Sequence, residues 1–179
     1  MIFRKLILLI IVFILFIINP THVYGYASHE TNDYKEVVEK SNQIIIGFAT
    51  GQGKSYINEN NKVITKWDIM THFVLKGDLP LKKIQVYSKG GEHKGYVQPG
   101  VKIDSTGRPY ILFLGQDDKG WYPIGNELGV RPVTMIKINS ITDIINIEII
   151  DKPLLKPLEE YLKEKNSSYK IKLKGENEK

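Results

Sequence analysis

The chain has 179 residues, with 25 Lys and Arg against 20 Asp and Glu, no cysteine, and 42% hydrophobic residues. The absence of cysteine excludes a disulfide-stapled domain, a zinc–thiolate site and a lipoprotein anchor. The apolar residues concentrate in one run near the N-terminus. The rest of the chain is too polar for a protein that crosses a membrane many times.

The first 27 residues have the pattern of an export signal. Arg4 and Lys5 precede an unbroken apolar run from Leu6 to Ile18. A membrane-spanning helix needs about 20 apolar residues and a signal-peptide core about 7–15, and this run fits the second range. Small residues then allow cleavage before Tyr26 or before Ser28. The sequence therefore predicts a signal peptide over residues 1–27.

An uncleaved N-terminal membrane anchor is the alternative for this segment, and both interpretations place the rest of the chain outside the cell or at its surface. Without Arg4 and Lys5, the rest of the chain carries 23 basic residues against 20 acidic ones. That excess is too small to indicate nucleic-acid binding. We therefore predict no nucleic-acid partner, and a membrane contact only through an uncleaved N-terminal segment.

The first half of the remaining chain predicts one helix and three strands. A short helix is predicted over Ser28–Ser41, and Asp33 can cap it. Consecutive β-branched residues then predict a buried strand over Ile44–Ala49. Alternating side chains predict a long strand over Val63–Lys76 and another over Lys83–Lys89.

The second half begins with Gly90–Gly107, which is rich in glycine and predicts a long loop with at most a short strand. Two strands joined by a hairpin turn at Gln116–Gly120 follow, and a further strand is expected over Val133–Ile138. The segment Ser140–Ile150 fits either a helix or a strand. Pro157–Lys165 predicts a short C-terminal helix.

The Lys-rich residues 166–179 are expected to be a disordered tail. Residues 28–165 are then a single domain, because neither a repeat nor a linker interrupts them. Five or six closely spaced strands with turns between them favour a mainly β fold. The fold class we predict is a small OB-like barrel of five to six strands, flanked by an N-terminal and a C-terminal helix.

Three sequence patterns could indicate a binding or catalytic site, but each has a simpler structural explanation. Gly51–Ser55 resembles a phosphate-binding loop, but the first glycine of that motif is absent and no helix is expected after it. His72 and His93 lack a third metal ligand at a workable spacing. Asp117 and Asp118 lie in a hairpin turn. We therefore predict no catalytic residue, no metal site and no cofactor.

Aromatic side chains could form a binding platform, although aromatic residues in strands usually pack in a core. They are Trp67, Tyr87, Tyr96, Tyr110, Trp121 and Tyr122. Tyr96 lies in the glycine-rich loop and is the best candidate for an exposed contact. We name Tyr96, His93 and Trp121 as possible partner contacts.

The order of several short motifs resembles exported bacterial proteins of the netrin-like, tissue-inhibitor-of-metalloproteinases-like group. The motifs are Ser41–Gly47, Thr71–Asp78, Ile84–Val86 and Gly107–Leu114, followed by Gly120–Tyr122. This resemblance implies an OB-type barrel with helices packed on it. Family members that inhibit metalloproteinases chelate zinc through an N-terminal cysteine, and this chain has no cysteine. The resemblance therefore implies a cysteine-free variant and transfers no site residue.

These observations lead to one expectation of function and two alternatives. We expect a secreted or cell-surface, non-catalytic module that binds a protein or a cell-envelope component. The first alternative is an inhibitor of an extracellular peptidase that acts through a loop. The second is an enzyme whose site has no sequence motif.

Overall fold

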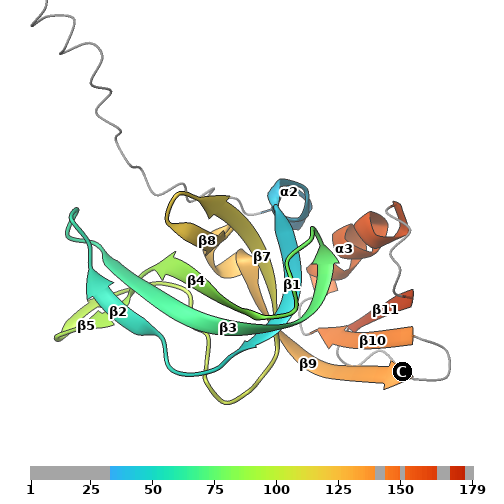
Figure 1. The fold of residues 1–179 in the computed structure, drawn as a ribbon. Coiled ribbons are helices and arrows are strands. Elements are labelled where there is room, and N and C mark those ends of the chain that lie inside the picture. The colour runs from blue at the N-terminus through green and yellow to red at the C-terminus, as the bar shows by residue number, and fades with distance from the viewer. Residues whose placement is uncertain (1–32, 140–143, 150–151, 165–169, 176–179) are drawn as a thin grey trace, which may run out of the picture.

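The computed structural model describes residues 33–139, 144–149, 152–164 and 170–175. The predicted signal peptide or anchor over residues 1–27 lies outside the described residues. Within them, Figure 1 shows curved strands wound around one another, with two helices against one side. None of the helices in these ranges is long and apolar enough to cross a membrane.

Five strands close into a barrel (Figure 1). Their order around it is β1, β3, β4, β8 and β7, and β7 pairs with β1 to complete the circle. Every neighbouring pair is antiparallel except β4 with β8, which is parallel and joins Val86 to Trp121. The bounds are β1 Gln43–Ala49, β3 Val63–Lys76, β4 Lys83–Lys89, β7 Tyr110–Asp117 and β8 Gly120–Pro123. The prediction of a small OB-like barrel is confirmed.

Alternation along the strands fills the barrel interior. On β3, Trp67 and Ile69 point inward and are buried, and Ile84 and Val86 of β4 lie in the same cluster. Because side chains alternate across a strand, the residues between them point to the outer face. Near the end of β3 this alternation shifts: Leu75 and Phe73 belong to a second core, whereas Val74 packs against the barrel-interior cluster.

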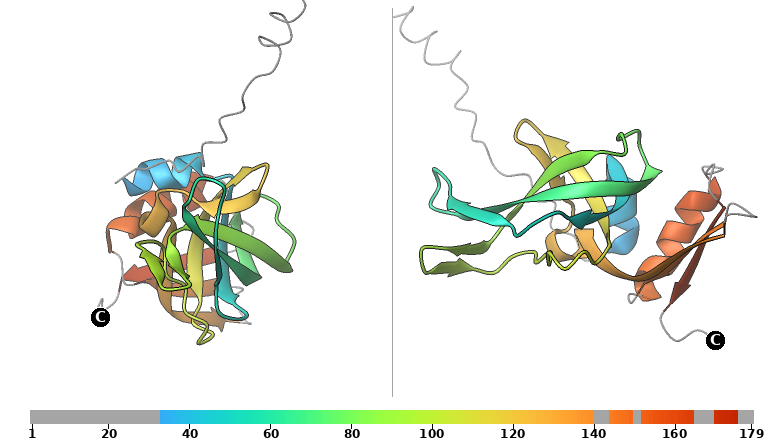
Figure 2. Two further views of the ribbon diagram at one scale, coloured as in Figure 1. Left: turned by 90° about the vertical axis from the view of Figure 1, so that its left-hand side faces the viewer. Right: turned by 60° about the horizontal axis from the view of Figure 1, so that its bottom comes forward.

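Two further strands pair with barrel strands and extend on opposite sides in Figure 1. Strand β2 (Lys54–Ile57) pairs with the beginning of β3, on the same edge that β1 uses further along. Strand β9 (Val130–Asn139) pairs with the first residues of β7 and then leaves the barrel. It continues into a small outlying sheet with β10 (Ile144–Ile149) and β11 (Lys170–Gly175) (Figure 2).

The helices cover the outer face of β1 and β7. Helix α2 (Tyr34–Lys40) begins at the predicted cap, where the Asp33 carboxylate accepts a hydrogen bond from the Lys35 backbone N–H at 2.9 Å. Helix α3 (Lys152–Glu164) packs beside it, and a short 3-10 helix, η1 (Asn126–Gly129), precedes β9. A second apolar core lies between this helical layer and the strands. Its members include Val37, Val38, Ile44, Ile46, Phe113 and Leu158.

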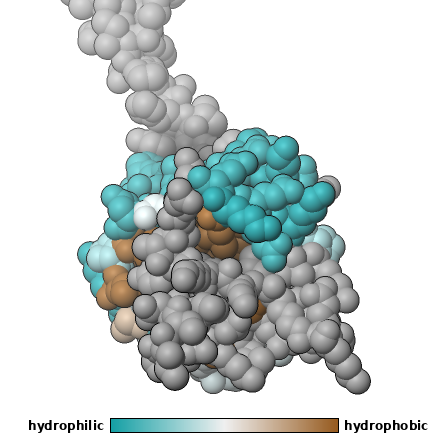
Figure 3. All heavy atoms as spheres, turned by 90° about the vertical axis from the view of Figure 1, so that its right-hand side faces the viewer, coloured by the Kyte–Doolittle hydropathy of each residue, from teal (hydrophilic) through white to brown (hydrophobic). Residues whose placement is uncertain are grey.

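The space-filling view from the side of α3 shows hydrophilic atoms over much of the coloured surface and hydrophobic atoms between them (Figure 3). Lys35, Glu39, Lys156 and Glu160 are exposed, whereas Leu154, Leu158 and Leu162 of α3 are buried. Both helices are therefore amphipathic elements whose apolar faces pack on the sheet.

The glycine-rich segment Gly90–Gly107 differs from the prediction of a long loop. It contains a hairpin of β5 (Gly91–His93) and β6 (Tyr96–Gln98). Lys94 and Gly95, at its tip, both have positive φ, as a two-residue hairpin turn requires. Its strands are too short for alternation to be visible in the sequence. Further on, Val101 and Ile103 are buried in the barrel interior.

The C-terminal predictions also need correction. Part of the segment Ser140–Ile150, which fitted either element, is strand β10. Helix α3 begins before the predicted Pro157, because Pro153 can occupy its first turn and Pro157 is accommodated inside. The prediction of disorder over 166–179 is wrong for Lys170–Gly175, which forms β11 parallel to β10. Pairing with β10 satisfies the backbone hydrogen-bonding groups of this segment, whereas its Lys-rich composition is typical of a solvated tail.

Candidate functional site

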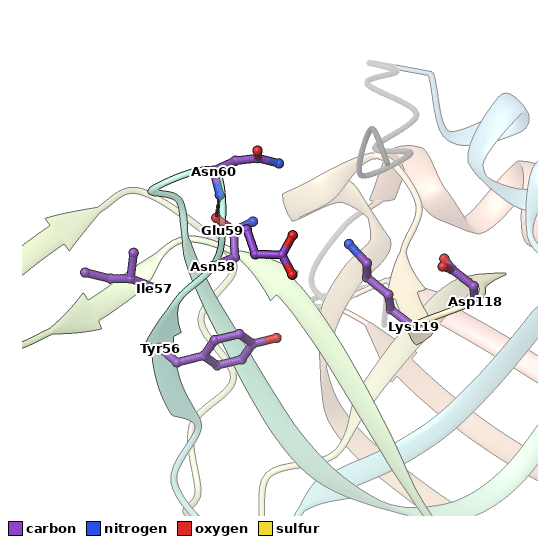
Figure 4. A pocket seen from close by; sticks show the side chains of 7 residues that line it. All are labelled: Tyr56, Ile57, Asn58, Glu59, Asn60, Asp118 and Lys119. Atoms are coloured by element: carbon purple, nitrogen blue, oxygen red, sulfur yellow. Dashed lines mark hydrogen bonds between the residues drawn. The ribbon is translucent and has the colours of Figure 1, made fainter. Parts of the chain in front are cut away.

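Two open depressions share the residue Tyr56 on the outer face of the barrel. The first has a volume of about 450 Å3 and lies between the β2–β3 turn and the β7–β8 turn (Figure 4). Its lining residues are Tyr56, Ile57, Asn58, Glu59, Asn60, Asp118 and Lys119. The second has a volume of about 590 Å3 and lies over the β1–β2 connection, β3 and β4. Together we call the two depressions the groove.

The second depression is lined by residues that strand pairing brings together. Lys54 and Tyr56 come from β2, Lys66 and Asp68 from β3, and Lys83 and Gln85 from β4, beside the backbone of Thr50–Gly53. On β3 these positions alternate with the buried Trp67 and Ile69, so they point away from the barrel interior. The groove is thus on the solvent side of the barrel wall.

Tyr56 lies between the two depressions and belongs to both. In Figure 4 its ring extends on the side of Asp118 and Lys119, and Ile57 points the opposite way, as successive residues of a strand do. The Tyr56 side chain is 36% exposed, and the Lys66 ammonium lies 5.5 Å from the centre of its ring. This cation–π contact orients the ring.

Positive charge dominates the second depression. Lys54 and Lys66 are directly opposite each other in the β2–β3 register. Lys83 forms a 2.7 Å ion pair with Asp68, and its hydrogen bond holds the pKa of that carboxyl below its ordinary value. Desolvation acts against this lowering of the pKa, whereas the charges of Lys83 and Lys54 and a hydrogen bond from Gln85 support it. Asp68 therefore neutralises one of the three ammonium groups.

Aromatic residues support the wall behind the groove. Tyr87 and Tyr122 are buried with Ile64 and Ile124, and the two rings lie 6.0 Å apart with a tilt of 46°. The Tyr87 hydroxyl donates to the Asp117 carboxylate. Burial, together with the charge of Asp117, raises the pKa of Tyr122. Side-chain packing in this cluster therefore holds β4 against β8, which share only the register pair of Val86 with Trp121.

Asp117 also shapes the β7–β8 turn at the rim of the first depression. Its second carboxylate oxygen accepts hydrogen bonds from the backbone N–H groups of Lys119 at 2.9 Å and Gly120 at 3.1 Å. One side chain therefore closes the turn and, through Tyr87, ties the turn to the barrel wall. The predicted hairpin turn over Gln116–Gly120 is confirmed.

The Gly51–Ser55 segment forms part of the groove's edge. The Thr50 backbone N–H donates to the Asp68 carbonyl at 2.9 Å, and strand β2 then begins at Lys54. A Cβ atom at Gly53 would lie 2.4 Å from Nε1 of Trp67, so this position requires glycine. A Cβ atom at Gly51 would meet nothing within 4 Å. A strand follows this segment where a phosphate-binding loop would have a helix.

The three residues named from the sequence as possible contacts lie outside the groove's lining. Tyr96 and its neighbour Val97 are 58% and 70% exposed on the β5–β6 hairpin. Nδ1 of His93 donates to the Ser55 carbonyl at 2.8 Å and so fixes that hairpin to β2. Trp121 is half-buried and packs against the barrel interior.

The residues that line the groove, among them Lys54, Tyr56 and Lys66, were not identified from the sequence as possible contacts. One sign of this polar surface is present in the sequence, because the outward positions of Val63–Lys76 carry Lys66 and Asp68. The pairing partner of that strand is not identifiable from the sequence, because the four residues Lys54–Ile57 are too few to show a strand period. Only the register of β2 with β3 shows that Lys54 faces Lys66.

Among the described residues, no group of three or more His, Asp or Glu side chains lies close enough together to hold a metal ion. His72 instead packs edge-on against Phe48, with ring centres 4.9 Å apart. No protein-family model matches the chain, and no curated protein matches it either.

Proposed function

We propose that this chain is an exported, non-catalytic binding module whose groove receives a partner at the cell surface. The observation that supports it is the shared position of Tyr56 between two depressions on one barrel face. OB-type barrels bind oligosaccharides and oligonucleotides on their second and third strands, between the loops after the first and the fourth strands. In this barrel those strands are β3 and β4, and those loops form the groove's rims.

The groove has the composition of a binding surface. It is open, it combines an exposed aromatic ring with amide and ammonium groups, and its backbone rim is held by strand pairing and by Asp117. Binding sites favour such fixed polar groups around an apolar or aromatic contact, because little conformational freedom is lost on binding. The N-terminal sequence pattern supports export, and the strand order supports the proposed relation to netrin-like proteins.

Site-specific photo-crosslinking in the full-length protein tests this function. A photoreactive phenylalanine analogue would replace Tyr56 in the groove, Tyr96 on the hairpin or Lys156 on α3, each in a separate protein. Irradiation with envelope extract should give a discrete adduct at position 56, which excess unmodified protein suppresses. Equal labelling at all three positions, or no labelling at position 56, would contradict a binding role for the groove.

The β5–β6 hairpin favours a second candidate, inhibition of an extracellular peptidase through a projecting segment. The hairpin presents Tyr96 and Val97 to solvent, and His93 and Gln98 fix it to the barrel. A rigid projecting segment can enter a peptidase cleft at low entropic cost. Adducts at position 96 alone, together with slowed cleavage by a peptidase, would favour this candidate. Unchanged cleavage by a panel of peptidases at micromolar protein would eliminate it.

A further inference from the structure

We propose that the groove binds an anionic glycan chain, in which Tyr56 stacks on a sugar ring and the lysines around it pair with acid groups along the polymer. This inference rests on the proposed binding function and specifies its ligand class. The ligands of this class share one chemistry, a chain of sugar rings that carries repeated carboxylate or phosphodiester groups.

The arrangement of lysines is the first argument. Like charges directly opposite on adjacent strands destabilise a sheet, yet Lys54 faces Lys66 in the β2–β3 register. Lys83 adds a third ammonium group on β4, and Asp68 is the one carboxylate in this lining. The depression therefore retains an excess of positive charge that an anionic ligand would neutralise.

The single aromatic ring is the second argument. Tyr56 is the one aromatic residue that lines either depression in the described chain. Single-stranded nucleic acids are usually held by successive aromatic rings, on which successive bases stack. One ring with a polar edge fits a sugar better, since the hydroxyl groups of a sugar need hydrogen-bonding partners around the stacked face.

The polar rim supplies those partners. Gln52 and Gln85 line the second depression, and Asn58 and Asn60 line the first. A primary amide both donates and accepts hydrogen bonds, as a sugar hydroxyl does. The Asn58 carboxamide oxygen also accepts from the backbone N–H groups of Asn60 at 3.1 Å and Lys62 at 2.8 Å, which fixes this rim.

The extent of the groove is the third argument. The two depressions have volumes of about 450 and 590 Å3 and meet at Tyr56. A ligand that fills both must extend to either side of the ring, so a chain fits better than a single sugar. Lys54, Lys66 and Lys83 lie on one side of this contact. On the other side Lys119 lies with two carboxylates, Glu59 and Asp118, so the excess of positive charge belongs to the second depression and the acid groups of the ligand would pair there.

Titration calorimetry with the full-length protein tests the ligand class. The probes are an oligogalacturonate, which carries carboxylates, a polymer of hexoses joined by phosphodiesters, a neutral dextran of similar length, and single-stranded oligothymidylate. We expect one of the first two to bind, the neutral dextran to bind at least about tenfold more weakly, and rising salt to weaken binding. The two acidic probes distinguish carboxylate from phosphodiester recognition.

Two variants separate charge recognition from fold defects. K54Q/K66Q/K83Q should weaken binding of the acidic probe by about tenfold or more, because exposed ion pairs each contribute modestly. The matched control, K102Q/K156Q/K163Q, removes three exposed lysines elsewhere and should bind as the unaltered protein does. Tyr56→Ala should weaken binding without changing its dependence on salt.

Each outcome bears on one of the two proposals. Tighter binding of oligothymidylate than of either acidic polymer would overturn the glycan assignment, as would equal binding of dextran. Absence of binding by both acidic polymers would overturn it too. If crosslinking at position 56 still succeeds in these cases, the groove remains a binding site for other chemistry. If crosslinking and calorimetry both fail, the proposed function fails as well.

Discussion

The Tyr110 hydroxyl donates a 2.9 Å hydrogen bond to Oδ2 of Asp104, and its oxygen accepts one from the Asp104 backbone N–H at 3.2 Å. These bonds join the first residue of β7 to the segment that carries the buried Val101 and Ile103. Tyr110 is itself buried in the barrel interior. The pair therefore holds one end of the barrel closed.

Tyr110→Phe should lower the free energy of unfolding by about 1 kcal/mol, because it removes the hydroxyl and keeps the packed ring. Denaturant unfolding monitored by tryptophan fluorescence would measure this loss. Thr106→Ala is the control: it removes a bond to the same carboxylate without touching the barrel, and should cost less. A loss as large in the control as in Tyr110→Phe would refute the closing role of the phenol.

The same contact predicts that the free energy of unfolding depends on pH. Hydrogen bonds from Thr106, then from Tyr110, lower the pKa of Asp104 from its ordinary value of 3.8. A carboxyl whose pKa is lower in the folded state stabilises the fold above the unfolded pKa and loses that contribution as pH falls through the folded pKa. The stability difference between the unaltered protein and Asp104→Asn should therefore be constant near neutral pH and shrink below about pH 4. A difference that persists unchanged at pH 2–3 would contradict this.

Lys76 ties the helical layer to the barrel. Its ammonium group donates to the carbonyls of Val38 and Glu39, both at 2.9 Å, and lies 5.1 Å from the centre of the Tyr161 ring. Carbonyls at the end of a helix lack partners within it, and a positive charge is favourable there. Lys76→Met should cost about 1–2 kcal/mol of stability, and should speed hydrogen exchange in α2. Lys82→Met, at an exposed position, is the matched control and should change neither quantity.

The two glycines of the β1–β2 connection should respond differently to alanine. Gly53→Ala places a Cβ atom 2.4 Å from Nε1 of Trp67 and 2.6 Å from Cγ2 of Thr65, so we expect a loss of about 1–3 kcal/mol from overpacking. Gly51→Ala meets open space and should change stability by less than about 0.5 kcal/mol. Thermal unfolding of both variants would compare them. Equal losses would show that Gly53 is not constrained by Trp67.

The β5–β6 hairpin should resist proteolysis as long as its contacts remain. The Gln98 side-chain oxygen accepts a 3.0 Å hydrogen bond from the backbone N–H of Val63, a fully buried residue. Gln98→Ala leaves that N–H without its acceptor, which costs about 1–3 kcal/mol when a buried donor stays unsatisfied. Trypsin should then cleave after Lys94 at the hairpin tip faster than in the unaltered protein. Glu92→Ala, an exposed change in the same hairpin, should leave the rate unchanged.

Long strands were predictable because their periodicity depends on one face being buried. Val63–Lys76 and Lys83–Lys89 coincide with β3 and β4 residue for residue, and Ile44–Ala49 differs from β1 only by Gln43. The three-residue strands β5 and β6 contain too few positions to show a period. Glycines at 90, 91 and 95 suggested a loop, whereas their positive φ angles serve the hairpin and its entry.

Strand β11 was missed for a different reason. Ile171 and Leu173 alternate with lysines, which is a strand pattern, but the segment's composition resembles a solvated tail. Its pairing with β10 is parallel and follows an intervening helix, so no neighbouring turn signals it. The groove was missed because it depends on which strands become neighbours: Lys54 and Lys83 lie on opposite sides of β3.

The parallel contact between β4 and β8 rests on the register pair of Val86 with Trp121, whereas each other joint of the barrel has several such pairs. A closed barrel that is destabilised opens first between the two neighbouring strands that share the fewest paired residues. The Tyr87–Tyr122 cluster lies over this joint, and Asp117 links it to the β7–β8 turn. Opening of the barrel would therefore start beside the first depression and widen it. A ligand that contacts both rims of that depression would oppose the separation of β4 from β8 and so stabilise the closed barrel.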